Sequence, residues 1–291
     1  MKKKICVALA VLLIAGVAVF AAGCGGDSDN SSTGKTTADE DTSLKDIQDA
    51  GVLILGCDDE FPPMGFIDEN GELTGFDIDL ARGVAERLGV QLEVKAIDWG
   101  SKELELQNKN IDVIWNGYTI DADRNEQVEF TKPYLNNEQL LVVKADSAVQ
   151  GKADLADKVV GVQIDSAAEK LVNGDAAFSG SLKEVRTYDD YQQALIDLKS
   201  SDRIDAVAVD KILINYVMLQ EPGTYRVLSE ALGDEYYGIG CRKGSISLRE
   251  AIDEALDEMQ KDGTTDTICA KWFDSNIVVR DVPKLIPSDF E

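Results

Sequence analysis

The feature that most constrains the fold is a series of short strands and helices that occurs twice in the same order. Buried strands are predicted, in chain order, at residues 52–58, 91–97, 111–115, 159–163, 185–187 and 205–209. Segments with helical spacing of apolar residues separate them within each series of three. Because parallel strands need crossover helices, two β-α-β-α-β series predict an α/β protein of two lobes, each with a mainly parallel sheet flanked by helices.

Two further predicted strands, at 139–144 and 236–242, lie on either side of the second series. They are expected to carry the chain between the lobes as a two-strand hinge. The last two predicted helices, at 248–262 and 264–273, return to the first lobe. This division assigns residues 44–138 and 236–291 to lobe 1, and residues 139–235 to lobe 2.

The N-terminus predicts export. Residues 1–4 are basic, residues 6–22 form a short apolar run, and small residues follow, so residues 1–23 are interpreted as a secretory signal. The alternative is a retained anchor helix, because the apolar run is at the lower edge of bilayer-spanning length.

The sequence Ala21-Ala22-Gly23-Cys24 resembles a bacterial lipobox, although Leu is commoner than Ala at its first position. This resemblance implies a lipoprotein whose Cys24 is acylated, with palmitate among the expected chains, and which is anchored outside the cytoplasm. Residues 24–43 are rich in Gly, Ser, Thr and Asp and predict a flexible tether.

Composition excludes several functions. The formal net charge is −25, and such a chain repels nucleic-acid phosphates, so no nucleic-acid partner is expected. The absence of His excludes His-based triads and His metal ligands. The spacing of Cys57, Cys241 and Cys269 fits no zinc motif, and no metal or cofactor is predicted. One disulfide with one thiol, or three buried thiols, are both compatible with the sequence.

Residues 111–134 contain the best candidate for binding a small carboxylate. The predicted strand breaks at Asn116-Gly117, where the missing Cβ lets a ligand approach the backbone. Thr119 adds a hydroxyl, and Arg124 adds a planar guanidinium that matches a carboxylate with two hydrogen bonds. The alternative is that Arg124 lies on the surface and pairs with its acidic neighbours, and this segment alone does not decide between the two.

Over residues 44–273 the order of motifs resembles the extracellular solute-binding proteins of family 3, the polar amino-acid-binding subunits of ABC importers. The motifs that carry this resemblance are Phe61-Pro62-Pro63, Gly75-Phe76-Asp77-Ile78-Asp79-Leu80, Ile111-Asp112, Gly117 with Thr119 and Arg124, Ile204-Asp205-Ala206-Val207 with Asp210, Tyr237-Gly238-Ile239, and Asp262-Gly263-Thr264 with Lys271-Trp272-Phe273. The resemblance implies a type II periplasmic-binding-protein-like fold whose two lobes close on one amino acid. It therefore favours the ligand role of Arg124.

The resemblance also implies roles around the ligand's α-carbon. Arg124 matches the residue that binds the α-carboxylate, and Thr119 matches a second donor. Gly117 would offer its carbonyl, and Asp210 its carboxylate, to the α-ammonium. Ser166 opens a predicted helix and would bring N–H and hydroxyl donors from the second lobe.

Other matched positions concern the ligand side chain. Phe61 and Trp99 match two aromatic residues that enclose it, and their flat faces suit an aliphatic stem, an amide or a guanidinium. Asp58 matches the residue that reads its far end, and Asn116 and Gln163 match flanking positions. A carboxylate at 58 favours glutamine or a basic amino acid over an acidic one, and cystine is a further candidate.

The expected function is therefore that of a monomeric binding subunit that delivers a polar amino acid to a membrane permease, without enzymatic activity. One alternative is a cyclohexadienyl-type dehydratase on the same fold, and another is an amino-acid sensor lipoprotein. The main departure from the family pattern is Asp165-Ser166, where Gly-Thr is usual. Asp165 brings a negative charge to this loop unless its side chain points outward.

Overall fold

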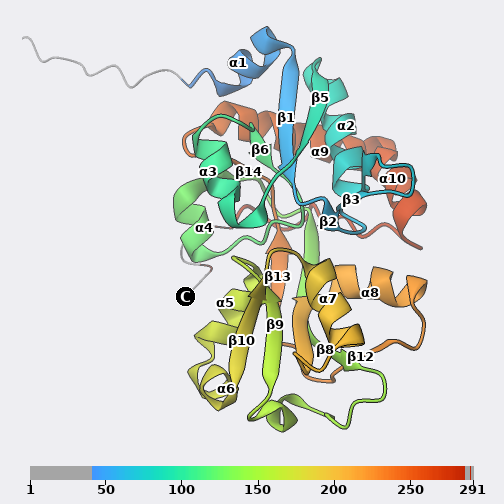
Figure 1. Ribbon diagram of the computed structural model, residues 1–291. Helices are drawn as coiled ribbons and strands as arrows, with labels where there is room; N and C mark the ends of the chain where they lie inside the picture. Colours follow the sequence, from blue (N-terminus) through green and yellow to red (C-terminus); the bar gives the residue numbers. More distant parts are fainter. Residues whose placement is uncertain (1–40, 286–288, 290–291) are drawn as a thin grey trace, which may run out of the picture. The chain divides into compact units, whose positions relative to one another are not determined.

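The computed structural model describes residues 41–285 and residue 289, and two large β-sheets organise this part of the chain (Figure 1). The sheet of lobe 1 has the strand order β5-β1-β6-β14-β7. Its strands are β1 (Val52–Cys57), β5 (Gln91–Ala96), β6 (Val113–Ile114), β7 (Val128–Phe130) and β14 (Gly240–Arg242). β1 is parallel to β5 and β6, whereas β14 is antiparallel to β6 and β7.

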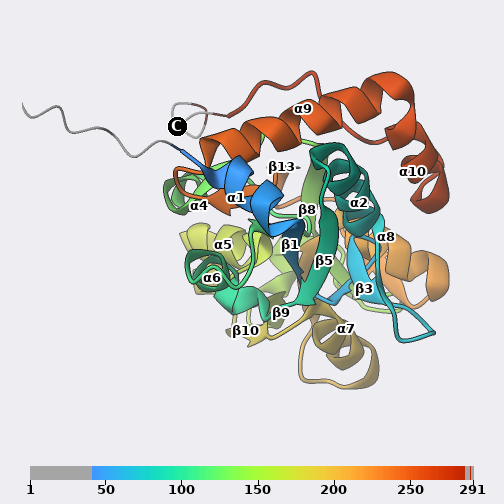
Figure 2. The ribbon, with the colours of Figure 1, turned by 90° about the horizontal axis from the view of Figure 1, so that it is seen from above.

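Helices cover both faces of this sheet because its strands carry apolar side chains on both. Leu53 and Leu55 of β1 face one core, whereas Ile54 packs against the other. On the first face, α2 (Phe76–Leu88) and α9 (Ile246–Asp262) lie side by side, and α10 (Thr264–Trp272) packs against both (Figure 2). The remaining elements of lobe 1 are α1 (Ser43–Ala50), β2 (Glu60–Phe61), β3 (Gly65–Ile67), β4 (Leu73–Thr74), η1 (Trp99–Ser101), α3 (Lys102–Gln107) and α4 (Ala122–Gln127).

The sheet of lobe 2 has the order β10-β9-β11-β8-β12, and β13 also pairs with β8. Its strands are β8 (Leu135–Lys144), β9 (Val159–Gln163), β10 (Glu184–Tyr188), β11 (Ala206–Asp210), β12 (Tyr225–Val227) and β13 (Gly233–Tyr237). Its helices are η2 (Lys152–Leu155), α5 (Ala167–Gly174), α6 (Ala176–Ser181), α7 (Tyr191–Ser200) and α8 (Lys211–Gln220). Among the described helices of the whole chain, none has the length and apolarity needed to cross a membrane.

The two predicted β-α-β-α-β series are confirmed as the three-stranded parallel parts β5-β1-β6 and β10-β9-β11. Each sheet is mixed as a whole, because the strands that join the lobes add antiparallel pairs. β3 and β4 pair antiparallel and form a hairpin whose turn contains Asn70-Gly71. The strand predicted at 111–115 is shorter than expected, since only Val113–Ile114 pair as β6 before the chain turns into the site.

The chain passes from β7 to β8 through residues 131–134, and returns from β13 to β14 through Gly238 and Ile239. Residues 139–144, predicted as one connection between the lobes, lie instead within β8, in the sheet of lobe 2. The two connections are joined to each other, since Thr131 N–H donates to the carbonyl of Ile239 at 3.0 Å and Ile239 N–H donates to the Thr131 hydroxyl at 3.0 Å.

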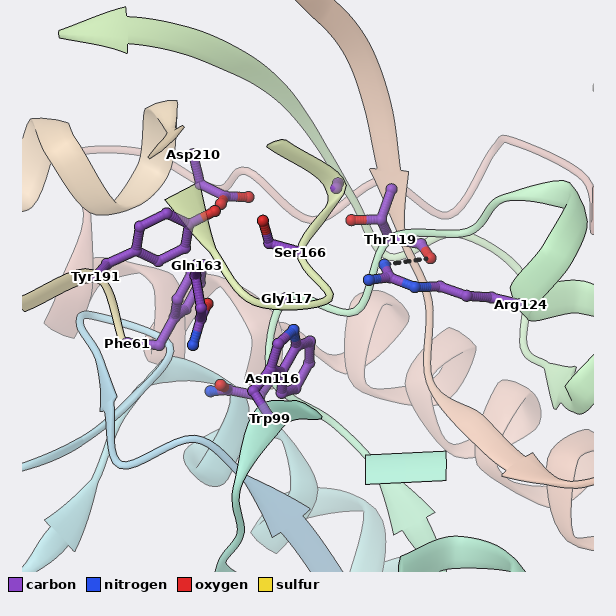
Figure 3. Close-up of a pocket in the computed structure, with 11 residues that line it drawn as sticks. Phe61, Trp99, Asn116, Gly117, Thr119, Arg124, Gln163, Ser166, Tyr191 and Asp210 are labelled. Carbon is purple, nitrogen blue, oxygen red and sulfur yellow. Dashed lines mark hydrogen bonds between the residues drawn. The ribbon is translucent and has the colours of Figure 1, made fainter. Parts of the chain in front are cut away.

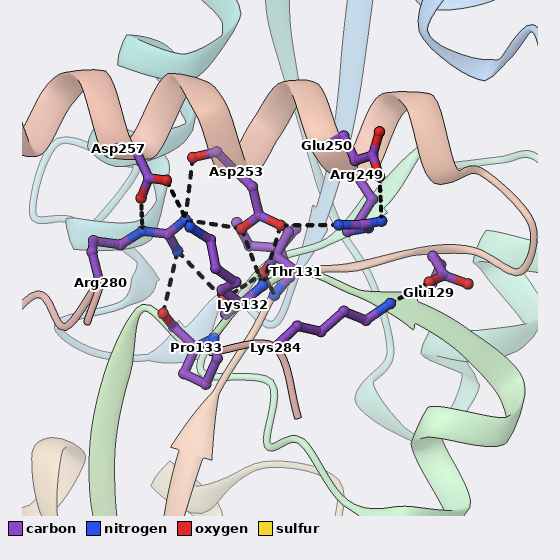
Figure 4. Close-up of polar contacts among 11 residues, drawn as sticks. Glu129, Thr131, Lys132, Pro133, Arg249, Glu250, Asp253, Asp257, Arg280 and Lys284 are labelled. Carbon is purple, nitrogen blue, oxygen red and sulfur yellow. Dashed lines mark hydrogen bonds and ion pairs between the residues drawn. The ribbon is translucent and has the colours of Figure 1, made fainter. Parts of the chain in front are cut away.

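A buried polar cluster fixes the first connection to lobe 1 (Figure 4). The Arg280 side chain is 6% exposed and donates to the carbonyls of Lys132 at 3.4 Å and Pro133 at 3.2 Å. The same guanidinium pairs with Asp253 at 2.9 Å and Asp257 at 2.8 Å, both on α9. The chain after α10 therefore holds the β7–β8 connection against the last long helix.

Cys57, Cys241 and Cys269 are buried and free, which selects three thiols over a disulfide. Burial raises the pKa of Cys57, and of Cys241, above the usual thiol range. These thiols are therefore protonated, inert parts of the core.

Candidate ligand-binding site

The carboxyl ends of the parallel strands in both lobes meet at one enclosed cavity (Figure 3). Its lining residues are Phe61, Trp99, Asn116, Gly117, Thr119, Arg124, Gln163, Ser166, Ala167, Tyr191 and Asp210. All predicted site residues except Asp58 are in this set, and Asp58 lies directly behind it. The cavity volume is about 10 Å³, close to the space of one water molecule, so an amino acid can enter only if the lobes move apart.

Arg124 is buried, not paired on the surface. It is 6% exposed and stacks over the Tyr118 ring, with the guanidinium carbon 4.8 Å from the ring centre. Nη1 donates to the Thr119 carbonyl at 3.2 Å, and Nη2 donates to the Asp165 carbonyl of lobe 2 at 2.8 Å. The predicted acidic neighbour Asp121 lies 3.6 Å from Nε and also caps α4 by accepting from the N–H of Arg124. These contacts orient the guanidinium at the edge of the cavity.

The loop before α5 brings donors from lobe 2. Ser166 is the N-cap of α5, and its hydroxyl accepts from the N–H of Glu169 at 3.0 Å. Asp165 has φ +55°, a left-handed conformation, and its half-exposed carboxylate, which is not in the cavity lining, pairs with Lys102. Its negative charge therefore faces away from the cavity, while its carbonyl faces Arg124.

Gly117 is placed by a buried carboxylate that sequence reasoning did not identify. Asp77 of α2 accepts hydrogen bonds from Gly117 N–H and from the Tyr134 hydroxyl, both at 2.8 Å. Burial raises the pKa of Asp77 to about 7. Gly117 has φ +58°, and a Cβ there would lie 3.0 Å from the Phe61 ring, so both its conformation and its surroundings favour glycine.

Asp210 ends β11 and is 4% exposed. Its Oδ1 accepts from the Tyr237 hydroxyl at 2.5 Å, from Gln139 Nε2 at 2.7 Å and from Asn137 Nδ2 at 3.0 Å. Burial raises the pKa of Asp210, and these hydrogen bonds oppose the rise. They fix the carboxylate at the lobe 2 side of the cavity.

Asn116 Nδ2, a buried donor on the cavity wall, has no hydrogen-bond partner within residues 41–285, whereas the Tyr191 hydroxyl lies near Ser166 and Asp210. Asn116 is held through its Oδ1, which accepts from Asp58 N–H at 3.2 Å. Tyr191 opens α7, and its ring centre lies 5.9 Å from that of Phe61. Sequence reasoning missed Tyr191, although it directly follows Asp190, whose side chain caps the predicted helix. An unpaired donor in a buried wall indicates a place for a ligand acceptor.

Asp58 lies behind the cavity wall, where it is hydrogen-bonded to Gln163. Its Oδ2 accepts from Gln163 Nε2 of lobe 2 at 2.5 Å, and its Oδ1 accepts from Glu60 N–H at 2.8 Å. Burial raises the pKa of Asp58 to about 6. Behind it is a second cavity, of about 320 Å³, whose charged lining residues are all acidic: Asp58, Asp59, Glu60, Asp98, Asp189 and Asp190.

Ion pairs connect the lobes beside the site, and each lobe supplies one of the cations. Lys102 of lobe 1 has a fully buried side chain and pairs with Asp165 of lobe 2. Its Nζ also lies 3.3 Å from the Asp165 carbonyl and 3.1 Å from the Trp99 carbonyl. Lys170 of lobe 2 pairs with Asp121 at 2.9 Å and Asp123 at 2.5 Å on lobe 1. The two lobes are thus in direct contact around the cavity.

Comparison with known proteins identifies relatives over most of the chain. The profile of the bacterial extracellular solute-binding proteins, family 3, matches residues 53–275. The L-cystine-binding protein TcyJ of Escherichia coli (strain K12) is 32% identical over 271 residues, which cover 92% of this chain and 94% of that protein.

Solved structures show the same fold. An ABC uptake transporter substrate-binding protein from Streptococcus pneumoniae with bound histidine has a TM-score of 0.79 and 35% identity, covering 82% of this chain and 98% of that one. An ancestral arginine-binding protein bound to glutamine has a TM-score of 0.71 and 42% identity, covering 77% and 98%. These relatives are named as binding proteins and not as enzymes, so the dehydratase alternative has no support.

Proposed function

The chain belongs to the bacterial extracellular solute-binding proteins of family 3, and we propose that its ligand is a polar amino acid with a basic or amide side chain. In this family the binding protein serves an ABC importer, and it hands the captured amino acid to the membrane permease. The proposal rests on one buried cation, Arg124, and one buried carboxylate, Asp210, in the lining of a single cavity, with a second buried carboxylate, Asp58, hydrogen-bonded to the lining residue Gln163.

The two ends of an α-amino acid fit the two charged sides of this cavity. The guanidinium of Arg124 retains N–H groups for the ligand's carboxylate, and the hydroxyl of Ser166 lies on the same wall from lobe 2. Asp210 would receive the ammonium group, together with the carbonyl of Gly117. Thr119 lies beside Arg124, as expected for a further polar contact.

The side chain of the ligand would pass Phe61, Trp99 and Tyr191 toward Asp58. A cation or an amide N–H can donate to this carboxylate, and a cation also gains from the acidic cavity behind it. An acidic side chain would meet only like charges there. Cystine, which the relative TcyJ is named for, would place a second carboxylate close to the same acids.

Ligand capture would depend on closure, since the cavity is too small for an amino acid to enter without lobe movement. Arg124 lies in lobe 1, whereas Ser166 and Asp210 lie in lobe 2, so a bound amino acid contacts both. A ligand shifts an equilibrium only by its difference in affinity for the two states. Contacts to both lobes supply that difference in favour of the closed state.

A thermal-shift screen would test this assignment directly. The mature chain from Cys24, with Cys24→Ser to prevent acylation, is unfolded and refolded to remove bound amino acid, then heated with each common amino acid and with cystine. Binding to the native state alone stabilises it by about 2.7 kcal/mol when the ligand is at a hundred times its Kd. We expect arginine, lysine or glutamine to give the largest shift. A larger shift with glutamate or aspartate would contradict the proposed role of Asp58.

We also propose that Cys24 is acylated, that the protein is anchored to the outer side of the cell membrane and that it works as a monomer. Residues 1–40 lie outside the described part of the chain, so this proposal rests on the sequence. Cys24→Ser should release the protein from the membrane fraction and remove the lipid mass from its N-terminal peptide. A membrane-bound Cys24→Ser protein would support the anchor-helix alternative instead.

A further inference from the structure

A second buried carboxyl group, Glu235, lies beside Asp210. It is on β13 and is 8% exposed, and its strand pairs with β8, as the strand of Asp210 does. β8 runs between β11 and β13, and its register places Gln139 opposite Asp210 and Asn137 opposite Glu235. Two acids from flanking strands therefore meet two amides from the strand between them.

The two acids share both amide donors. Asn137 Nδ2 donates to Glu235 Oε1 at 2.6 Å and to Asp210 Oδ1 at 3.0 Å. Gln139 Nε2 donates to Glu235 Oε1 at 2.8 Å and to Asp210 Oδ1 at 2.7 Å. The other oxygen of Glu235 accepts from the Thr119 hydroxyl at 3.0 Å. Glu235 is thus connected both to the ammonium side and to the carboxylate side of the cavity.

No Lys or Arg within residues 41–285 forms an ion pair with either acid. The nearest sequence neighbour, Lys211, pairs with Glu138 instead, and Lys170, which lines a cavity on the other side of Glu235, pairs with Asp121 and Asp123. Two buried like charges without a cation cannot both remain ionised, so the pair retains a proton.

The remaining groups around the pair do not supply positive charge. Tyr191 of α7 and Tyr237 of β13 lie near Asp210, and Thr119 contacts Glu235. Asp121, Asp234 and Asp289 line the cavity behind Glu235 and are acidic. Arg124 lines the same cavity, but its ion pair is with Asp121, so the cation that can compensate the two acids is one brought by a ligand.

We propose that Glu235 is the second acid of the ammonium subsite, sharing one proton with Asp210 in the free protein and releasing it to solvent when the ligand's ammonium group binds. This inference rests on the proposed function. In the step, the O–H bond of the Glu235 carboxyl breaks, water or buffer takes the proton, and the ammonium keeps all of its own protons. The net charge of the subsite stays at −1, because one cation enters as one proton leaves.

The protonation state of the free protein agrees with this exchange. Burial and the adjacent charge of Asp210 raise the pKa of Glu235 to about 8, and burial also raises the pKa of Asp210. Glu235 therefore holds the shared proton at neutral pH. Well above pH 8 it would be ionised before the ligand arrives, and no proton would then be released.

Calorimetry in buffers that differ in ionisation enthalpy counts released protons. The mature chain is titrated with L-arginine, L-glutamine and L-cystine in turn, in phosphate and in Tris at pH 7 and pH 9. For an amino acid that binds, we expect the wild type to release close to one proton more than Glu235→Gln at pH 7, and this difference to fall toward zero at pH 9, where uptake by the ligand's own amine is common to both proteins. Between pH 6 and pH 8, affinity should rise by up to about tenfold per pH unit.

Glu235→Gln keeps the size and acceptor of the side chain but cannot hold the shared proton. It should bind without proton release at pH 7, whereas Glu138→Gln, on the neighbouring strand β8, half-buried and paired with Lys211, should behave as wild type. Equal proton release from wild type and Glu235→Gln, or binding by wild type at pH 7 without release, would overturn the proposal.

An infrared titration of the free protein separates this proposal from the proposed function. Protonated carboxyl groups absorb apart from carboxylates, and the wild type should lose such a band near pH 8 that Glu235→Gln lacks. A missing band overturns the carboxyl pair even if amino acids bind. Its presence without binding of any amino acid would retain the pair and refute the amino-acid ligand. If the variant does not fold, proton release on binding by the wild type still decides, because Asp77 titrates near pH 7 and contributes an infrared band of its own.

Discussion

The Lys102–Asp165 pair should stabilise the closed state, because it joins side chains of different lobes. Lys102 is fully buried, and its Nζ contacts both the carboxylate and, at 3.3 Å, the carbonyl of Asp165. Asp165 is half-exposed, so solvent weakens the pair. A hydrogen bond to a charged group contributes about 1.5–3 kcal/mol, and we take about 1.5 kcal/mol, which corresponds to about a tenfold change in Kd.

A double-mutant cycle measures this contact. Lys102→Met removes the cation, Asp165→Asn removes the charge on the other lobe, and the double variant corrects for the contacts that Lys102 makes within lobe 1 with Trp99 and Glu103. Stopped-flow fluorescence of Trp99, which lines the cavity, gives the association and dissociation rates of the ligand. We expect faster dissociation in both single variants and a coupling near the full tenfold effect.

Lys170→Met is the matched control. Lys170 also joins the lobes, but its side chain is 48% exposed, and exposed pairs contribute about 0.2–1 kcal/mol. Its effect should be smaller and should disappear in high salt. A coupling near zero between Lys102 and Asp165, or an equal effect from Lys170→Met, would refute the reasoning.

Three further perturbations test the site and the hinge. Arg124→Ala should abolish binding detectable by calorimetry, since it removes the only buried guanidinium in the described cavity lining, and micromolar binding by this variant would contradict the carboxylate subsite. Asp58→Asn should weaken the binding of arginine more than the binding of glutamine. Because burial raises the pKa of Asp58 to about 6, the affinity of the wild type for arginine should fall as the pH drops through 6. The variant should lack this part of the pH profile. Arg280→Gln should lower the free energy of unfolding by about 2–3 kcal/mol in urea titrations, because it removes the guanidinium from the Lys132 and Pro133 carbonyls and leaves buried Asp253 with Arg249 as its remaining ion-pair partner. A loss below about 1 kcal/mol would show that the cluster is solvated.

The secondary structure and the order of the parallel strands followed from the sequence because both depend on short-range information. Helix α2 shows this clearly: apolar residues recur at helical spacing, and Gly89 ends it in the left-handed conformation. The parallel units followed because crossover connections of this length permit few topologies. The positions of Arg124, Ser166 and Asp210 at strand or helix ends followed from the same reasoning.

The residues at which the chain crosses from one lobe to the other could not be predicted from the spacing of apolar residues. An apolar strand such as β8 has the same appearance whether it joins two sheets or lies in one, and only its pairing with β11 and β13 places residues 139–144 in lobe 2. The same holds for Gly238, where a Cβ would lie 2.7 Å from Ile120. Close packing of that kind depends on a partner far away in the sequence.

The sequence by itself therefore determined the two α/β units, the family and most of the residues that line the cavity. Only the tertiary structure placed Glu235 and Asn137 beside Asp210, Lys102 beside Asp165, and Tyr191 in the cavity wall. The hydrogen bond between Lys102 and Asp165 joins residues 63 positions apart, and the bond between Asn137 and Glu235 joins residues 98 positions apart. They depend on strand register and on the approach of the two lobes, which local periodicity does not encode, because a side chain's distant neighbours are set by the packing of whole elements.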